Sequence, residues 1–280
     1  MKILDGRLIK EQILDELKGE VSKLSEKPNL VVIQVGDNDI SNVYINHKRK
    51  MAEFIGYGFN LLKFPLDVKE EVILNEIDRL NNDKSVHGML VQLPLPVHLD
   101  KAKLQTAISV LKDVDGLSDI NAGMLFHNKD CLFPCTPYGV MELLKRYNIS
   151  VSGLNAVVVG RSHLVGKPMA TLLTNSDATV TLCHSKTKNL GEITKKADLL
   201  VVAVGYPGLI TADMVKDDAI VIDVGINKVN DKLCGDVLYD EVSKKASYIT
   251  PVPGGVGQMT VAMIGVNLLT AYNMQMGKNN

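Results

Sequence analysis

The sequence predicts an α/β protein with two domains, each built on a mostly parallel sheet. Three observations support this fold class. Apolar runs of strand length alternate with amphipathic helical segments over the first hundred residues, as in repeated βα units. A second series of this kind follows an irregular stretch, residues 112–139, which is rich in Gly, Pro, Asp and Asn. A chain of 280 residues is also long enough to build two medium-sized cores.

The elements of the first series follow from hydrophobic periodicity. Apolar residues recur every three to four positions in the helical segments and run together in the strand segments. We expect helices at residues 6–24, 41–55 and 68–82, and strands at residues 30–35, 57–64 and 87–93.

The second series has the spacing of a doubly wound nucleotide-binding unit. Its strand-like runs are short and mostly apolar, as in buried parallel strands. We expect a helix at residues 138–147, strands at 155–160, 178–183, 198–205 and 219–225, and a closing apolar helix at about 259–272.

The composition excludes several classes of partner. The formal net charge is −1, which gives no reason to expect nucleic acid or an anionic membrane as the main partner. The first ten residues mix charged and apolar side chains, and no apolar run approaches the roughly 18–20 residues of a membrane span. We expect a soluble, unexported protein of the cytoplasm.

The four cysteines lack the spacing of a zinc site. Cys131 and Cys135 are four residues apart, but Pro134 and Pro137 indicate an irregular segment without a second pair of ligands. We therefore expect reduced thiols and no bound metal.

One lysine lies on the apolar face of its predicted helix. Over residues 41–55, Lys48 shares a face with Tyr44, Met51 and Ile55. Either its stem packs on apolar surface while the ammonium reaches water, or the amine is held in a cleft where burial lowers its pKa. Tyr44 is either a packing residue or a ring that stacks on a flat ligand.

Two further polar residues are candidates for the same site. Gln92 ends the apolar run "GMLVQ", and ligands bind beyond the carboxyl ends of strands in α/β sheets. Its amide either orients Lys48 or caps the strand. Asp115, in "DVDG", is either a turn residue or an acceptor for an amino-bearing heterocycle.

The loop "GRSHLVGKP" (residues 160–168) follows a strand and precedes a helix, as a pyrophosphate-binding turn does. Its spacing is G-x-S-x-x-x-G instead of G-x-G-x-x-G, so a plain βα turn is the alternative. The next strand ends in Cys183-His184-Ser185-Lys186, without the acidic residue that binds the ribose in NAD sites. A hydroxyl and a cation suit a 2′-phosphate, which Arg161 is also placed to reach, so we favour NADP over NAD.

Taken together, these segments resemble the bifunctional methylenetetrahydrofolate dehydrogenase/cyclohydrolase family. The matching pieces follow one another in family order over nearly the whole chain: "VGDNDISNVYINHKRK", "GMLVQLPLP", "KDVDG", "NAG", "FPCTPYG", "VVVGRSHLVGKP", "ATVTLCHSKT", "ADLLVVAVGYPG", "VIDVGIN", "GDV" and "TPVPGGVGQMT". The resemblance implies NADP-dependent oxidation of 5,10-methylenetetrahydrofolate, followed by hydrolysis to 10-formyltetrahydrofolate.

The resemblance also implies a role for each matching residue. Lys48 matches the lysine needed for the cyclohydrolase step, Tyr44 the tyrosine that stacks on the pterin, Gln92 the glutamine that tunes the lysine, and Asp115 the aspartate that reads the pterin's amino edge. The loop closing over folate and nicotinamide matches Gly254, Gly255 and Val256. The implied cofactor positions are Gly160, Arg161, Ser162, Val165, Gly166, His184, Ser185 and Ile226, with Ser185 at the 2′-phosphate.

The resemblance further implies an α/β catalytic domain at residues 1–134, a Rossmann-type NADP-binding domain at residues 135–258, and a last segment, 259–280, that returns to the first domain. It implies a folate cleft between the domains and a homodimer. Two alternatives remain. One is a monofunctional dehydrogenase in which Lys48 is inert, and the other is a non-catalytic sensor that binds nucleotide or folate.

The chain departs from the family pattern at a few positions. Leu117, Ser118 and Asp119 replace Phe, His and Pro, Gln258 replaces a proline, and Tyr206 stands where lysine is frequent. Asp119 either alters the charge near the substrate or lies in solvent, and Gln258 is expected to loosen the entry to the last helix. None of these departures touches the four residues assigned to the catalytic site.

Overall fold

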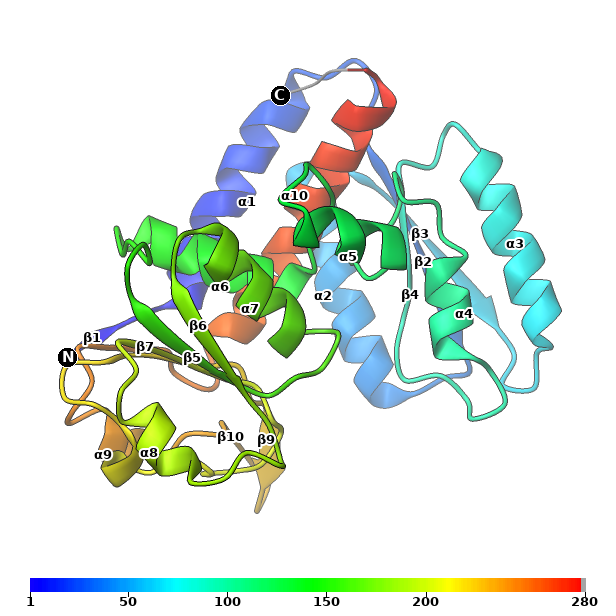
Figure 1. Cartoon of the computed structure of the whole chain (residues 1–280). Coiled ribbons are helices and arrows are strands. Elements are labelled where there is room, and N and C mark those ends of the chain that lie inside the picture. The colour runs from blue at the N-terminus through cyan, green and yellow to red at the C-terminus, as the bar shows by residue number, and fades with distance from the viewer. Residues whose placement is uncertain (278–280) are drawn as a thin grey trace. The chain divides into compact units, whose positions relative to one another are not determined.

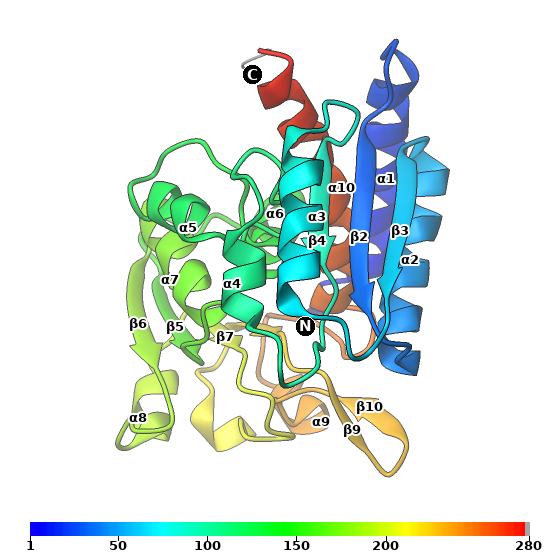
Figure 2. The same ribbon diagram turned by 90° about the vertical axis from the view of Figure 1, so that its right-hand side faces the viewer.

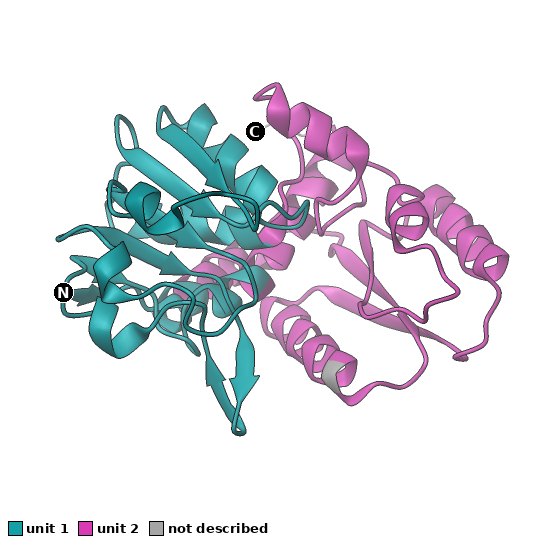
Figure 3. Cartoon of the chain, turned by 60° about the horizontal axis from the view of Figure 1, so that its bottom comes forward, with its two compact units in different colours: residues 1–11, 136–260 teal, residues 12–135, 261–280 magenta. Residues whose placement is uncertain are grey.

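The computed structural model describes residues 1–277, except for the side chain of residue 40. The chain forms two compact units (Figure 3). Unit 1 contains residues 1–11 and 136–260, and unit 2 contains residues 12–135 and 261–280. The predicted class, a two-domain α/β protein with parallel sheets, is confirmed.

The division into units differs from the predicted domain ranges at the N-terminus. Residues 1–11 group with unit 1 because β1 (Lys2–Ile3) pairs in parallel with β11 (Tyr248–Ile249). Such two-residue strands carry no periodic signal in the sequence. Of the segment 259–280 that was predicted to return to the first domain, residues 278–280 lie outside the described residues.

Unit 2 is built on a parallel three-stranded sheet in the order β3-β2-β4. Figure 2 shows helices on both faces of this sheet. On one face, Ile33 of β2 joins Ile73 and Ile77 of α3 and Leu104 of α4 in a buried apolar cluster. The elements are β2 (Asn29–Val35), β3 (Gly58–Phe64), β4 (Gly88–Val91), α2 (Asp39–Ile55), α3 (Glu70–Asn82), α4 (Lys101–Thr106), α5 (Asp119–Phe126) and parts of α1 (Gly6–Ser22) and α10 (Val256–Gln275).

The last helix, α10, packs closely within unit 2 at two glycines. A Cβ on Gly265 would lie 3.1 Å from the Leu17 side chain of α1 and 3.2 Å from the Met51 sulfur of α2. A Cβ on Gly88, at the start of β4, would lie 2.7 Å from the Leu268 side chain of α10. Small residues at these points allow the long apolar helix to approach both the helices and the sheet.

Unit 1 is built on a six-stranded parallel sheet in the order β1-β11-β8-β7-β5-β6. The chain leaves β5 for β6 on one side and then crosses to β7 on the other, so β5 and β7 flank the point where the winding reverses (Figure 1). The further elements are β5 (Asn155–Val159), β6 (Thr179–Cys183), β7 (Leu199–Val202), β8 (Ile220–Asp223), β9 (Asn227–Val229), β10 (Lys232–Cys234), α6 (Cys135–Arg146), α7 (Gly166–Asn175), α8 (Leu190–Thr194), η1 (Ala212–Met214) and α9 (Tyr239–Val242).

The prediction of an irregular segment at residues 112–139 is wrong in part. Helix α5 lies inside it, with Ser118 as its N-cap accepting a hydrogen bond from the Asn121 backbone N–H. Helix α6 begins at Cys135, three residues earlier than predicted, because Pro137 is tolerated in a first helical turn. The antiparallel hairpin β9–β10 and the short helices α4, α8 and α9 were not predicted.

Within residues 1–277, no helix combines the length and the apolar character needed to cross a membrane.

Candidate active site

Helix α2 carries Lys48 on the face that it buries against the rest of unit 2. Lys48 is 8% exposed, and Met51 and Ile55, farther along the same face, are each 2% exposed. The Lys48 Nζ donates a hydrogen bond to Gln92 Oε1 over 2.7 Å. The interpretation in which the Lys48 ammonium reaches water is therefore wrong.

Gln92 follows β4 and is held at both ends. Its backbone N–H donates to the Ile33 carbonyl of β2, and its side-chain Nε2 donates to the Leu93 carbonyl over 2.7 Å. Because Nε2 is engaged in this way, the other amide atom, Oε1, faces Lys48. Gln92 therefore both orients the lysine and caps the end of the strand.

Asp115 is a carboxylate whose charge acts on Lys48. It is half-buried in the turn that follows Asp113, where the Gly116 N–H donates to the Asp113 carbonyl. The turn interpretation of Asp115 is thus confirmed, and it coexists with the electrostatic contact.

Burial and charge move the two pKa values in opposite directions. Burial lowers the pKa of Lys48, while the negative charge of Asp115 acts against this shift. Burial raises the pKa of Asp115, and the positive charge of Lys48 opposes that rise. An amine and a carboxyl group that are both easier to neutralise than usual can exchange protons with a bound substrate.

Tyr44 lies one helical turn before Lys48 and is 42% exposed. The prediction that it shares the buried face, and the interpretation that it is a core packing residue, are therefore wrong. The neighbouring Ile45, 3% exposed, fills that position in the core. The Tyr44 ring remains accessible to a flat ligand beside the lysine.

Two site residues were not foreseen from the sequence. Cys135 is 4% exposed, and burial, with the negative charge of Asp115, raises its thiol pKa well above the usual value. Asn267 of α10, 2% exposed, donates hydrogen bonds to the two loops that carry Asp115 and Cys135. An amide between apolar neighbours in the middle of the helix was the available signal for Asn267, because buried polar groups need partners.

In unit 1, the loop after β5 has the close packing of a phosphate-binding turn. Gly160 has a φ of +118°, and a Cβ there would overlap the Ala203 carbonyl oxygen beyond β7. A Cβ on Gly166, the first residue of α7, would overlap the Gly160 carbonyl. The N-terminus of α7 therefore starts directly beside the end of β5, and the positive end of the helix dipole there favours an anion.

Ser162 organises this loop. Its Oγ accepts a hydrogen bond from the Val165 N–H at 3.2 Å and lies 3.5 Å from the Gly166 nitrogen. Arg161 is exposed, so its guanidinium is free of the core.

The segment after β6 exposes the residues that suit a phosphate. Ser185 and Lys186 are exposed, while His184 is half-buried. The His184 N–H donates to Thr187 Oγ1 over 2.8 Å, and the Lys186 N–H donates to His184 Nδ1. His184 therefore shapes the turn that presents Ser185.

The remaining predicted positions also lie in unit 1. Gly254 has a φ of +113°, and the next two residues, Gly255 and Val256, lead into α10. A Cβ on Gly257 would lie 3.1 Å from the Ile226 side chain, so Ile226 contacts the first turn of that helix. The structure thus places Ile226 against the residue that follows the Gly254–Val256 loop.

Two family models cover most of the chain. The model described as tetrahydrofolate dehydrogenase/cyclohydrolase, catalytic domain, matches residues 4–115, and the NAD(P)-binding domain of the same name matches residues 134–276. The chain belongs to the tetrahydrofolate dehydrogenase/cyclohydrolase family.

Relatives of this family match along the full length. The bifunctional protein FolD of Halalkalibacterium halodurans is 50% identical over 272 residues, which cover 96% of this chain and 98% of the relative. The crystal structure of the bifunctional FolD enzyme of Campylobacter jejuni has a TM-score of 0.96 and 46% identity, covering 98% and 99% of the two chains. That of the Trypanosoma brucei FolD enzyme, complexed with NADP cofactor and inhibitor, has a TM-score of 0.92 and 39% identity, covering 97% of each chain.

The departures from the family pattern have structural explanations. Asp119 is exposed in the first turn of α5, where a negative charge is favourable at the positive end of a helix. The backbone N–H of Gln258, which a proline would lack, donates to the Gly255 carbonyl. The side-chain Oε1 of Gln258 accepts a hydrogen bond from Lys10. Gln258 is therefore fixed, and the expected loosening of the helix entry does not occur. Tyr206 is 65% exposed.

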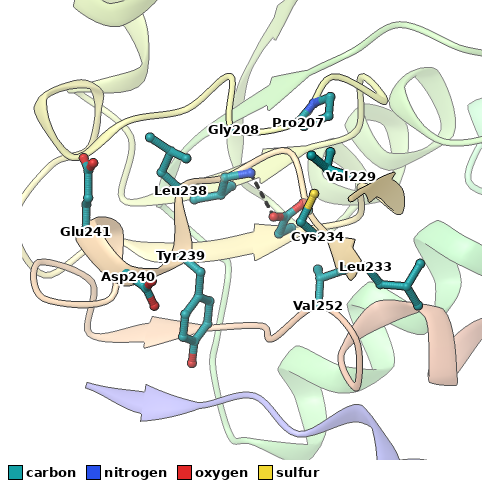
Figure 4. Close-up of a pocket in the computed structure, with 13 residues that line it drawn as sticks. Pro207, Gly208, Val229, Leu233, Cys234, Leu238, Tyr239, Asp240, Glu241 and Val252 are labelled. Carbon is teal, nitrogen blue, oxygen red and sulfur yellow. Dashed lines mark hydrogen bonds between the residues drawn. The ribbon is translucent and has the colours of Figure 1, made fainter. Parts of the chain in front are cut away.

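A pocket of about 490 Å³ lies beyond the end of β8 in unit 1 of this dehydrogenase/cyclohydrolase. Figure 4 shows Val229 and Leu233 on one side of it and the acidic Asp240 and Glu241 on the other. The Asp223 carboxylate also lines the pocket and accepts hydrogen bonds from the backbone of the loops around it.

Two buried carboxylates fix the loops around this pocket. Asp223 accepts hydrogen bonds from the N–H groups of Gly225, Asp236 and Val237, and burial raises its pKa to about 6. Asp236 accepts from Val204 and Gly205, which follow β7. The turn that leads to Ile226 is therefore tied to the loop after β7.

Within the described residues, no group of three or more His, Cys, Asp or Glu side chains is arranged to hold a metal ion.

Proposed function

We propose that this protein oxidises 5,10-methylenetetrahydrofolate with NADP⁺ and then hydrolyses the methenyl product to 10-formyltetrahydrofolate. The observation that carries the proposal is the buried hydrogen bond between Lys48 and Gln92, beside Asp115, in a protein of this family. Family membership supports both activities, and the intact lysine site supports the hydrolytic one.

The loop geometry fits NADP. The glycines at 160 and 166 let the start of α7 pack directly against the ends of β5 and β7, and the N-terminus of a helix favours an anion such as the cofactor's phosphates. Ser185 and Lys186 offer a hydroxyl and a cation to a 2′-phosphate, and no acid stands in that segment to repel it. The proposed contacts are Gly160, Arg161, Ser162, Val165, Gly166, His184, Ser185 and Ile226.

In the dehydrogenase step, the protein binds and aligns the two reactants. NADP⁺, when bound, supplies the acceptor for a hydride from the one-carbon bridge of the folate. Tyr44 would stack on the pterin, Asp115 would accept hydrogen bonds from its amino edge, and the loop of Gly254, Gly255 and Val256 would close over the reacting rings. Nitrogen lone pairs of the folate stabilise the resulting cation, so alignment is the main contribution of these residues.

In the cyclohydrolase step, Lys48 would transfer protons. Water adds to the methenyl carbon, and one C–N bond breaks to leave the formyl product. A lysine with an ordinary pKa of about 10.4 is almost wholly protonated at neutral pH. Burial of Lys48 favours the neutral amine, which can take a proton from the attacking water and return it to the departing nitrogen. Gln92 would hold the amine in place during this exchange.

We further propose that the catalytic domain spans residues 1–134 with 259–280, and the NADP-binding domain residues 135–258. A homodimer of the cytoplasm completes the proposal. The exposed apolar side chains of Val229 and Leu233 on the β9–β10 hairpin support pairing of two copies, and the four free thiols suit a reducing compartment.

Two absorbance assays separate this function from its alternatives. Purified protein is mixed with methylenetetrahydrofolate and NADP⁺ while reduced nicotinamide is followed, and methenyltetrahydrofolate is added separately while its decay is followed. We expect cofactor reduction and a methenyl decay faster than the uncatalysed rate. Reduction without accelerated decay would indicate a monofunctional dehydrogenase. Binding of both ligands without any absorbance change would indicate a sensor.

A further inference from the structure

The amide of Asn267 bridges two loops of unit 2. Its Nδ2 donates to the Val114 carbonyl and to the Phe133 carbonyl, both over 2.8 Å, and lies 3.5 Å from Cys135 Sγ. An amide nitrogen has two protons, and each is directed to one loop. Asn267 itself is 2% exposed on α10, so its position is set by the packing of that helix.

Each bridged carbonyl belongs to a residue one or two positions before a site residue. Val114 is followed by Asp115, and Phe133 is followed after one proline by Cys135. The Cys135 thiol donates to the same Val114 carbonyl at 3.2 Å. The negative charge of Asp115 also acts on the pKa of Lys48.

The two loops touch directly at a glycine. A Cβ on Gly116, which has a φ of +67°, would overlap the Phe133 carbonyl. This close approach leaves the Val114 and Phe133 oxygens near enough to share one amide. Without Asn267, the Phe133 carbonyl would lose this donor and the Val114 carbonyl would keep only the Cys135 thiol, a state that the loops would relieve by moving apart.

We propose that Asn267 is a positioning residue that holds Asp115 against the folate pterin and beside Lys48. The inference rests on the proposed function, and it goes beyond that function in assigning folate recognition to a residue of α10. Asn267 does not touch the reacting atoms. It acts through the Val114–Asp115 peptide.

The chain offers a matched control on the same helix. Gln275 of α10 also uses one amide nitrogen to bridge two carbonyl groups, those of His87 and Leu111, over 2.7 and 2.9 Å. Neither of those carbonyls belongs to a loop residue next to Asp115 or Cys135. Asn267→Ala and Gln275→Ala therefore remove the same kind of bridge, but only the first frees the site loops.

The test measures KM and kcat for the folate substrate and for NADP⁺ in both variants, under conditions where denaturant unfolding shows each to be folded. We expect Asn267→Ala to raise the KM for methylenetetrahydrofolate about tenfold or more, while the KM for NADP⁺ changes less than about twofold. Gln275→Ala should leave both values within about twofold of wild type. Equal shifts in the two variants, or no shift in Asn267→Ala, would overturn the inference.

A second variant and a second readout keep the test decisive. Asn267→Ser retains one donor and should give an intermediate KM even if Asn267→Ala does not fold.

Calorimetric binding of tetrahydrofolate tests the positioning role without turnover, since the affinity should weaken in Asn267→Ala and not in Gln275→Ala. If wild type binds tetrahydrofolate but converts nothing, the proposed function fails while the Asn267 comparison still holds. If wild type does not bind tetrahydrofolate, both proposals fail.

Discussion

Lys48 Nζ and Gln92 Oε1 lie 2.7 Å apart, and both residues are 8% exposed. The partner of the buried ammonium is thus a neutral amide, not a carboxylate. A neutral acceptor satisfies one N–H of the lysine without adding a negative charge that would hold the proton on it. This pairing is what permits a buried lysine to lose its proton readily.

Replacing the amide by a carboxylate should reverse this effect. In Gln92→Glu, a negative charge beside Lys48 would raise the pKa of the lysine and reduce its neutral fraction. We expect the cyclohydrolase rate at neutral pH to fall about tenfold or more, with the acid limb of its pH profile moved to higher pH. The dehydrogenase rate of the same preparation is the internal control. Equal loss of both activities would argue against this role of Gln92.

The lowered pKa of Lys48 predicts a pH dependence of stability. Between the folded pKa and the ordinary value near 10.4, the unfolded chain binds more protons than the folded one, so the free energy of unfolding rises with pH. Lys48→Met removes this contribution. The stability of wild type relative to Lys48→Met should therefore increase with pH towards about 10.4, by at most about 1.4 kcal/mol per pH unit.

Denaturant unfolding at a series of pH values measures this difference. Lys50→Met removes an exposed lysine from the same helix and controls for the loss of a cation there. A constant difference between wild type and Lys48→Met throughout the alkaline range would contradict the lowered pKa.

The segment after β6 predicts the cofactor preference. Ser185→Asp would place an acid where NAD enzymes bind the ribose hydroxyls, and it would repel a 2′-phosphate. We expect the KM for NADP⁺ to rise about tenfold or more, while the KM for NAD⁺ falls or stays constant. Asn189→Asp makes the same charge change at another exposed position nearby. If both variants change the ratio of the two KM values equally, Ser185 does not contact the 2′-phosphate.

The turn after β5 predicts a severe effect of a single methyl group. Gly160→Ala combines a φ of +118° with overlap between the new Cβ and the Ala203 carbonyl, so we expect a loss of about 2 kcal/mol or more and weaker NADP⁺ binding. Gly153→Ala is the control, because Gly153 also has a positive φ, +77°, but nothing within 4 Å of the added Cβ. Unfolding midpoints and NADP⁺ titrations of the two variants should differ clearly. Similar values would mean that the approach to Ala203 is unimportant.

Strong local patterns made most of the fold predictable. The apolar runs that became β2, β5 and β8 were placed within one or two residues, because buried parallel strands are short and uniformly apolar. The pairing of β1 with β11 was not predictable, since it joins two-residue strands about 245 positions apart. Helix α5 was missed because its signal is a capping serine within a segment of turn-forming residues.

The candidate site was only partly predictable for a similar reason. Helical spacing put both Lys48 and Tyr44 on a buried face, but Tyr44 is exposed in the structure. The spacing alone does not say how far along the helix the buried face extends. The partnership of Lys48 with Gln92 depends on a strand 44 residues away. The bridge from Asn267 depends on contacts across more than 130 residues, which no local pattern encodes.

The most direct measurement follows reduced nicotinamide and methenyltetrahydrofolate together after mixing methylenetetrahydrofolate and NADP⁺ with wild type and with Lys48→Met. The proposed role of Lys48 predicts that wild type reduces the cofactor without accumulating the methenyl compound, whereas Lys48→Met accumulates it or stalls. Identical time courses for the two proteins would contradict the role of Lys48 in hydrolysis.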